Sequence, residues 1–420
     1  MVHQVLQRLG FQLSSPQPTP MSTDHSLSAP PSDESVELSG PYRELVSCLM
    51  YLMTCTRPYL AYPLSLLARY VAPSRNQKVH WDAAKRVLRN FCSTSGMRLV
   101  LGGRGLVVLT GHANTSWVDD SATQRSSQGY TFSLDSGSLS WRSTRSSSVL
   151  SSSYEVEIYA GAMAAQELRW LTYLLTDLGE QPHSPPILYV DNKPMIALCQ
   201  EHRLEHRTKH IALRYFLARE LQQRGQLCLA YVATRANTAY IFTKALAPGD
   251  HQRFSTVLGL IVMDAEMASR KSTGTYVDAV PRPRANIVDG MWIFKGSLPE
   301  EIWLRRPPGF TGSFPTPLGF APSTSDPSLF LRTDTSLTLF YVLVYVDNLV
   351  FATANTEALA LVKSELQERH TCTDLGPSAL RLPVLLATIH FSAYRSLTLS
   401  STFGRVCRAE WPVSRACGLL

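Results

Sequence analysis

Residues 151–171, SSSYEVEIYAGAMAAQELRWL, and the apolar run ILYVDNK at 187–193 decide the fold class of this chain. The first segment predicts a long helix, because serines that can cap it precede apolar residues at helical spacing. Its expected buried face carries Ile158, Ala162, Ala165, Leu168, Leu171 and Leu175. The second segment predicts a buried strand that ends at Asp191 and is followed by a helix. Such a junction places a carboxylate at the rim where α/β sheets bind their ligands.

The segments around this helix and strand alternate in the same way. Residues 97–114 and 128–144 have the periodicity of strands with Gly and Ser at the turns, so three antiparallel strands should precede the helix. After Asp191 we expect, in order, a helix at 195–198, a helix at 212–223, a strand at 227–234 and a last helix from Asn237. The predicted order is β, β, β, α, β, α, α, β, α.

The N-terminal part has a different composition. Residues 14–40 are rich in Ser and Pro, a composition that buries little surface, so they predict a linker. Apolar residues at helical spacing over 45–70 and 81–92 then predict two or three packed helices.

The C-terminal part carries weaker signals. After Leu260, the convincing patterns are a hairpin over 328–353 and a helix over Thr356–Arg369. The tail after Gly376 has few periodic or turn signals, and we predict no fold for it.

Composition limits the class of protein. A chain of 420 residues that is 45% hydrophobic can form two or three domains. Its 40 Lys and Arg against 33 Asp and Glu favour a polyanionic partner without requiring one. The eight cysteines form no CxxC pair, which fits a reducing compartment and no zinc site. No segment has the pattern of a signal peptide or a membrane span, so we expect a soluble intracellular protein, cytoplasmic or nuclear, without a membrane partner.

Asp191 has a natural partner in Glu157, in the first turn of the long helix. Mg²⁺ takes oxygen ligands, and two-metal phosphodiester cleavage needs acidic side chains from several elements to hold ions about 4 Å apart. Taken singly, Glu157 could instead be an acid facing the helix dipole, and Asp191 a helix cap.

Six segments strengthen the interpretation as a nuclease site. They are GHANTSWVDD (111–120), TQRSSQGYTF (123–132), SWRSTRSSSVLSSSYEVEIYAGAMAAQELRWL (140–171), LYVDNKPMIAL (188–198), HRTKHIALRYFLARE (206–220) and RANTAYIFTKAL (235–246). In order and spacing they resemble the RNase H domain of copia-type retrotransposon polyproteins, over about residues 98–254. TRPYLAYPLSLLARY (56–70) and HWDAAKRVLRNF (80–91) resemble the family's connection region. The resemblance implies Mg²⁺-dependent cleavage of the RNA strand in RNA/DNA hybrids.

The resemblance also implies a site of four carboxylates, two of which are replaced here. The family's acids on the first strand, the first helix, the next strand and near the C-terminal helix correspond to Asn114, Glu157, Asp191 and Tyr240. Asn114 keeps an oxygen but loses the charge, and Tyr240 offers a bulky phenol. With Glu157 and Asp191 as the remaining metal ligands, we expect weak or absent Mg²⁺ binding and little or no catalysis.

A second fragment, over residues 264–376, resembles the same family's reverse transcriptase, which normally precedes the RNase H domain. A polymerase palm holds two Mg²⁺ ions with an Asp from one strand and an Asp-Asp pair in a hairpin. Here Asp347 is followed by Asn348, and the strand with the partner Asp is missing between Lys295 and Gly296. The resemblance therefore implies a palm without RNA-directed DNA synthesis.

The expected fold class is α/β: an RNase H-like mixed sheet flanked by helices, plus an incomplete α+β reverse-transcriptase palm fragment. The expected regions are a polymerase-end helix and Ser/Pro-rich linker at 1–40, a helical connection region at 41–97, an RNase H-like domain at 98–254, an irregular remnant of the polymerase fingers at 255–316, a partial palm at 317–376 and an unassigned tail at 377–420.

Three hypotheses for function follow. The first is a transposon-derived pseudoenzyme. The second, an active ribonuclease H, needs Asp119 or Asp120 to replace the missing acid, although both lie beyond the strand position. The third is a non-enzymatic module that holds RNA or DNA backbones with Arg207, Lys209 and His210, which could equally form a solvated basic loop.

Overall fold

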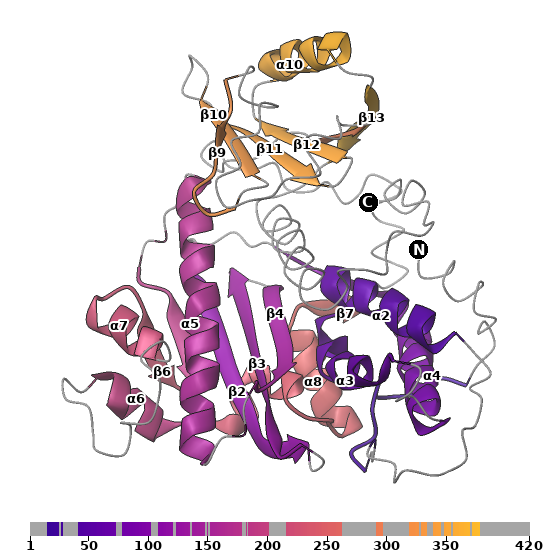
Figure 1. Cartoon of the computed structure of the whole chain (residues 1–420), viewed down its shortest axis with the longest axis vertical. Helices are drawn as coiled ribbons and strands as arrows, with labels where there is room; N and C mark the ends of the chain where they lie inside the picture. The colour runs from indigo at the N-terminus through magenta and orange to yellow at the C-terminus, as the bar shows by residue number, and fades with distance from the viewer. Residues whose placement is uncertain are drawn as a thin grey trace. The chain divides into compact units, whose positions relative to one another are not determined.

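The chain divides into two compact units, each described here by itself (Figure 1). Unit 1 comprises residues 1–172 and 181–273, and unit 2 comprises residues 173–180 and 274–420. The computed structural model describes residues 15–24, 27, 41–72, 78–101, 108–120, 123–134, 137–147, 149, 152–178, 182, 184–200, 216–262, 291–296, 319–326, 329–333, 339–345, 348–353, 356–369 and 372–378.

Unit 1 contains a five-stranded mixed sheet in the order β4-β3-β2-β5-β6. The strands β2 (Leu109–Asp120), β3 (Arg125–Leu134) and β4 (Ser138–Arg145) are antiparallel, as the sequence predicts. The strands β5 (Ile187–Val190) and β6 (Cys228–Tyr231) continue the sheet parallel to β2. This arrangement, flanked by helices, is RNase H-like, so the expected fold class is confirmed.

The long predicted helix is α5 (Ser153–Asp177). The six residues expected on its apolar face are each 3% exposed or less. Ser152 Oγ accepts a hydrogen bond from Glu155 N at 3.2 Å, as expected of an N-terminal serine. Ser140 Oγ in β4 donates to Glu167 Oε1 at 2.7 Å, which fixes α5 against the sheet. Although α5 is long, none of the helices in the described ranges is long and apolar enough to cross a membrane.

Two shorter helices follow the parallel strands, and the chain then turns differently from the sequence prediction. These helices are α6 (Lys193–Gln200) and α7 (Leu217–Gln223). After β6 come two 3₁₀ turns, η5 (Thr234–Ala236) and η6 (Thr238–Phe242), followed by α8 (Pro248–Val257). The α-helix predicted from Asn237 is therefore wrong. Asn237 instead caps η6, and α8 begins at a proline, which is well suited to the first turn of a helix.

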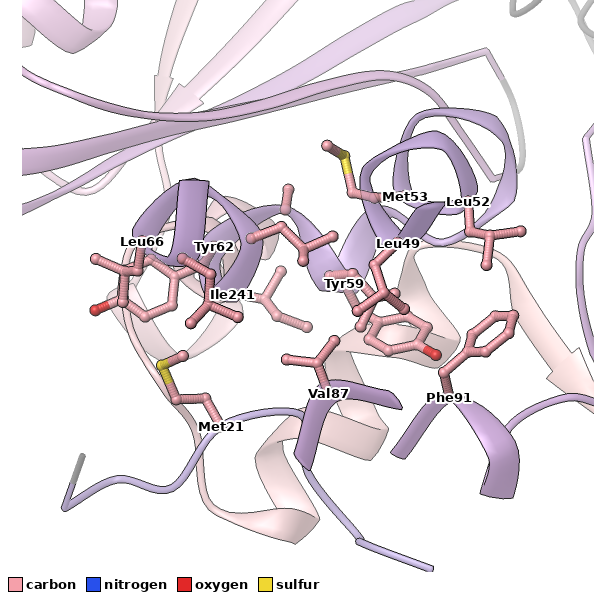
Figure 2. Close-up of a cluster of buried hydrophobic side chains, with 14 of the residues drawn as sticks. Met21, Leu49, Leu52, Met53, Tyr59, Tyr62, Leu66, Val87, Phe91 and Ile241 are labelled. Atoms are coloured by element: carbon pink, nitrogen blue, oxygen red, sulfur yellow. The ribbon is translucent and has the colours of Figure 1, made fainter. Parts of the chain in front are cut away.

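A helical region precedes the sheet, where the periodicity predicts helices. It consists of α2 (Tyr42–Thr56), η1 (Pro58–Leu60), α3 (Ala61–Leu67), η2 (Ala68–Tyr70) and α4 (Lys78–Ser93). Its apolar residues share one cluster, the connection core, with η6 and α8 (Figure 2). The connection core includes Tyr59, Leu60, Leu64, Leu88, Phe91, Ile241, Phe242, Phe254 and Leu258, each 2% exposed or less. The connection helices and the RNase H-like part are thus packed as one unit.

Two further contacts bind this unit together. Strand β1 (Met97–Leu99) pairs antiparallel with β7 (Leu260–Val262). The segment expected to be a linker packs against α4: Asn90 Nδ2 donates to Gln17 O at 2.9 Å, and Met21 is 3% exposed. Its Ser/Pro-rich composition gave no hint of this, because a few apolar residues and backbone carbonyls make the contact.

Unit 2 contains a six-stranded sheet in the order β13-β8-β12-β11-β10-β9 whose neighbours are all antiparallel. Its elements are β8 (Met291–Gly296), β9 (Ala321–Pro322), β10 (Leu329–Thr333), β11 (Leu339–Tyr345), β12 (Asn348–Thr353), α10 (Thr356–Arg369) and β13 (Cys372–Ser378). The predicted hairpin and the helix after it are confirmed as β10, β11, β12 and α10.

Candidate functional site

Strands β2 and β5 bring two of the predicted site residues to one end of the sheet. The last residues paired between these parallel strands are His112 and Tyr189, whose rings stack with centroids 5.1 Å apart. Asn114 lies two residues further along β2, and Asp191 lies just beyond the end of β5. We call the four predicted positions the rim: Asn114, Glu157, Asp191 and Tyr240.

Glu157, in α5, is held by β2. Thr115 Oγ1 donates a hydrogen bond to Glu157 Oε1 at 2.7 Å. Burial, and to a smaller extent the charge of Asp191, raise the pKa of the Glu157 carboxyl to about 7, although the Thr115 bond and Lys244 act to lower it. Glu157 and Asp191 are therefore close enough to repel each other. The contact with Thr115 also makes Glu157 more than an acid facing the helix dipole.

Asp191 lies just beyond β5 and is half-buried. Thr234 Oγ1, in η5, donates to Asp191 Oδ2 at 2.7 Å. The cap of α6 is the next residue, Asn192, whose Oδ1 accepts from Met195 N at 2.9 Å. The interpretation of Asp191 as a helix cap is therefore wrong, and its carboxylate instead accepts the hydrogen bond from Thr234.

The two replaced positions are joined through Thr243. Asn114 is 2% exposed, and its Nδ2 donates to Thr243 Oγ1 at 2.8 Å. Thr243 Oγ1 in turn donates to the backbone oxygen of Tyr240 at 3.0 Å. The Lys244 ammonium lies 4.1 Å from the centroid of the Tyr240 ring, a cation–π contact. Asn114 and Thr115 are successive strand residues, so one reaches η6 and the other reaches α5 on the opposite face.

Asn237 is a site residue that sequence reasoning missed. It is fully buried, and its Nδ2 donates to the backbone oxygen of Ala113 at 2.8 Å. Its Oδ1 accepts from Ala239 N at 3.1 Å. Asn237 therefore ties the start of η6 to β2 next to Asn114. An Asn at a predicted helix start signals a cap, but nothing in the sequence signals the second bond.

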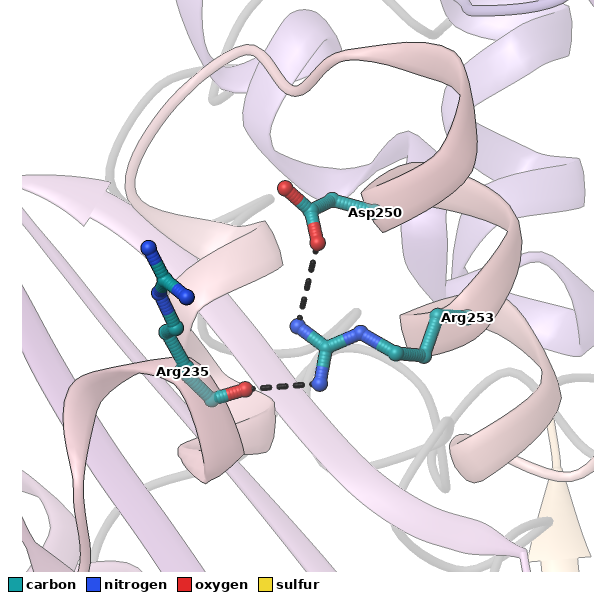
Figure 3. A network of polar contacts seen from close by, with 3 residues as sticks. All are labelled: Arg235, Asp250 and Arg253. Carbon is teal, nitrogen blue, oxygen red and sulfur yellow. Dashed lines mark hydrogen bonds and ion pairs between the residues drawn. The ribbon is translucent and has the colours of Figure 1, made fainter.

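The loop that carries Thr234 is held by α8 (Figure 3). Arg253 Nη1 donates to the backbone oxygen of Arg235 at 2.7 Å, and Arg253 Nη2 pairs with Asp250 Oδ1 at 3.1 Å. The guanidinium thus joins η5 to α8 on the solvent side, and η5 presents Thr234 to Asp191. This contact supports one remaining acid from outside the rim.

Asp119 bonds within the β2–β3 strand pair. Its two carboxylate oxygens accept from Ser127 N and Ser127 Oγ, both at 2.6 Å. These bonds stabilise the irregular end of the β2–β3 pair, where the register shifts between Ser116 and Asp120. Asp119 is therefore a structural residue of the strand pair.

The donor set of the rim does not fit a two-metal site. In the described part of the chain, no three His, Cys, Asp or Glu side chains gather so that they could hold a metal ion. The rim retains two carboxylates, and the Asn114 amide nitrogen is a hydrogen-bond donor to Thr243. Two Mg²⁺ ions require more anionic oxygen than Glu157 and Asp191 supply.

The other predicted site residues cannot be placed in this site. Arg207, Lys209, His210 and Asp347 lie outside the described residues. Asn348 begins β12, where its backbone pairs with Tyr345 across the hairpin.

Comparison with known proteins finds relatives that include Pol polyproteins of plant transposons. The chain is 34% identical over 259 residues to the retrovirus-related Pol polyprotein from transposon RE2 of Arabidopsis thaliana, covering 61% of this chain and 17% of that protein. It is 30% identical over 264 residues to the corresponding polyprotein from transposon TNT 1-94 of Nicotiana tabacum, covering 62% of this chain and 20% of that protein. The chain thus spans a fifth or less of the length of these relatives.

Two other comparisons add little. No family model matches the chain. The N-terminal RNase H domain of rv2228c from Mycobacterium tuberculosis is a weak structural match, with 12% identity, a TM-score of 0.25 and coverage of 36% of this chain and 97% of that domain. Sequence identity over about 60% of the chain decides the relationship. Over that part, the chain is similar to retrovirus-related Pol polyproteins of copia-type plant transposons.

Proposed function

We propose that unit 1 is the RNase H-like part of a copia-type Pol polyprotein whose cleavage site is catalytically impaired. The family reaction is Mg²⁺-dependent cleavage of the RNA strand in an RNA/DNA hybrid. The observation that carries the proposal is the contact of Asn114, a buried amide that donates to Thr243 at a position where the resemblance implies a metal-binding Asp.

The remaining acids support this proposal. Glu157 is partly protonated near neutral pH, since burial and the charge of Asp191 raise its pKa to about 7. Two bound divalent ions need deprotonated oxygens from several elements, and the two retained carboxylates already repel each other without them. The fold is therefore kept, while the site binds divalent metal ions less strongly.

The direct test is cleavage of a labelled RNA/DNA hybrid by the full chain in Mg²⁺ or Mn²⁺. We expect no cleavage above the background of an Asp191→Asn variant prepared in the same way. Robust cleavage that disappears in Asp191→Asn would show that the two acids suffice and would overturn the proposal.

A second candidate function, non-enzymatic nucleic-acid binding, is favoured by the charges beside Asp191. Lys193 and Arg235 are both exposed, and the Lys193 ammonium lies 4.8 Å from the centroid of the Tyr231 ring. Cations next to an aromatic face suit a phosphodiester backbone and its bases.

This candidate is tested by the affinity for a fluorescent RNA/DNA hybrid at several salt concentrations. Lys193→Gln with Arg235→Gln should weaken binding and flatten its salt dependence, because fewer counterions are released. Arg224→Gln is a matched control, since this exposed arginine already pairs with Glu220 at 2.8 Å. Equal losses in the test and control variants would argue against a specific surface.

A further inference from the structure

The feature of interest is the pair of hydrogen bonds that joins η6 to β2 at two successive residues. Asn237 Nδ2 donates to the Ala113 backbone oxygen at 2.8 Å, and Asn114 Nδ2 donates to Thr243 Oγ1 at 2.8 Å. One bond therefore lies at each end of η6, and between them Phe242 packs on Gly129, the β3 partner of Asn114. A side chain larger than glycine at 129 would collide with Phe242, so η6 and the sheet approach closely here.

The bond from Asn114 has a fixed direction. Thr243 Oγ1 has one proton, and it donates that proton to the backbone oxygen of Tyr240 at 3.0 Å. While it makes that bond, Thr243 Oγ1 accepts from residue 114. An amide can donate this bond, whereas an ionised carboxylate cannot.

Burial makes this bond matter. Asn114 is 2% exposed and Thr243 is fully buried, so water cannot easily replace a lost partner. Leaving a buried polar group without a partner costs more than the net gain from making the bond.

We propose that the former metal site has become a metal-independent latch, in which the Asn114 amide holds η6 on β2 through Thr243. Residue 114 in this chain stabilises the fold by donating a hydrogen bond, a role that the family's acid cannot fill. The residue that makes the rim unsuitable for a metal ion, Asn114, is thus the one that makes the stabilising hydrogen bond. The inference rests on the proposed function only for the claim that the position once bound metal.

The test compares stability in EDTA at pH 8, where neither a metal nor cleavage takes part. Asn114→Asp should increase the unfolding equilibrium constant by about tenfold or more, measured by urea denaturation of the full chain, because a buried bond is lost. Asn192→Asp is the matched control: its Oδ1 still accepts from Met195 N, so its midpoint should stay close to that of the parent chain.

Two further variants separate the latch from a simple effect of charge. Asn114→Ala removes the donor without adding charge and should also destabilise the chain. In a Thr243→Val background the donor has no acceptor, so Asn114→Ala should have much less effect there. If Asn114→Asp does not fold, this cycle alone decides the matter.

A local readout completes the experiment. Breaking the latch should accelerate amide hydrogen exchange at Tyr240 and Thr243, whose N–H groups donate within η6, and leave α6 unchanged. The proposal is wrong if Asn114→Ala is as stable as the parent, or if its effect is the same with and without Thr243. Failure of the cleavage proposal alone would leave all of these stability results unchanged.

Discussion

The connection core and the rim both lie in unit 1. The connection core is closely packed with buried apolar side chains, whereas the rim has only two of the four carboxylates that a two-metal site would be expected to have. In the connection core, large side chains such as Tyr59, Phe91 and Phe242 are at most 1% exposed. At the rim, two carboxylates remain beside two neutral residues that bond to the fold. In the described residues, the packing of an RNase H-like fold is therefore present, whereas no group of acids that could hold a metal ion is.

This difference follows from what each region requires. A hydrophobic core accepts many residues of similar size, because the free energy of burial depends on area and volume. A metal site needs charged oxygens at particular positions, and one Asp-to-Asn change removes charge without changing shape. Residues that define the chemistry can thus change while the fold persists.

The largest expected effect is a gain of RNA/DNA hybrid cleavage when acids are introduced at the rim. Asn114→Asp with Tyr240→Asp should raise hybrid cleavage in Mg²⁺ by about 100-fold or more over the parent chain, whereas either single change should give much less. Acids that share metal ions act as a unit, so their effects are not additive. An Asp at 114 can no longer donate to Thr243, which frees its side chain for a metal ion.

The readout is initial cleavage rate under single-turnover conditions, with the same double variant carrying Asp191→Asn as control. A double variant that folds and binds hybrid but does not cleave would mean that the four rim positions are assigned incorrectly. It would also mean that the absence of cleavage in the parent chain is not explained by the residues at these four positions.

The next effect concerns a polar group inside the connection core. His251 is 7% exposed, its ring lies edge-on to Tyr59 with centroids 5.2 Å apart, and its Nε2 has no hydrogen-bond partner among the described residues. Burial lowers the pKa of His251 from 6.5 to about 4. Between these values the unfolded chain binds a proton that the folded chain excludes, so the free energy of unfolding falls as the pH is lowered.

The loss attributable to His251 should approach about 3 kcal/mol at pH 4, since each pKa unit corresponds to about 1.4 kcal/mol. Above pH 6.5 no such loss is expected. Urea denaturation between pH 7.5 and 4.5 should show a weaker pH dependence in His251→Gln. Some dependence should remain, because burial also lowers the pKa of His112 to about 4. An unchanged slope would show that His251 is protonated without penalty in the folded core.

The last prediction is that a substitution in the β11–β12 hairpin has no effect on polymerase activity. Asn348→Asp should not produce template-dependent primer extension, because the resemblance implies that the strand with the partner Asp is deleted between Lys295 and Gly296. In the structure these two residues are consecutive in β8, where Lys295 pairs with Asn348 and Gly296 with Cys372. A gel-based extension assay of this variant, with an active reverse transcriptase as control, tests the prediction. Any extension would show that the missing strand has been inferred incorrectly.

The sequence was most informative where periodicity and burial agree. The apolar face of α5, the strand that ends at Asp191 and the hairpin of β10, β11 and β12 are all present as predicted. Prediction was poorer where local composition and tertiary contacts differ. The segment at 15–24 looks like a linker but packs on α4, and η6 looks like an α-helix but is kept short by the bonds of Asn237.

At the rim, motif spacing gave the four positions but not their interactions. The pairing of Glu157 with Thr115 and of Asp191 with Thr234 depends on which elements pack together, and hydroxyl groups of this kind carry no signal in a single sequence. The direction of the Asn114 bond depends in addition on the one proton of Thr243. The resemblance therefore predicted which acids are replaced, whereas the contacts of the replacing side chains required the structure.

The pairing of β1 with β7 has a consequence for how such a chain can be assembled. Met97 lies opposite Val262, so the end of the RNase H-like part returns to where its sheet region begins. A module whose entry and exit points adjoin can receive foreign sequence at its exit with little disturbance, because no buried backbone is interrupted there. Such a module can keep its fold when other sequence is joined after residue 262.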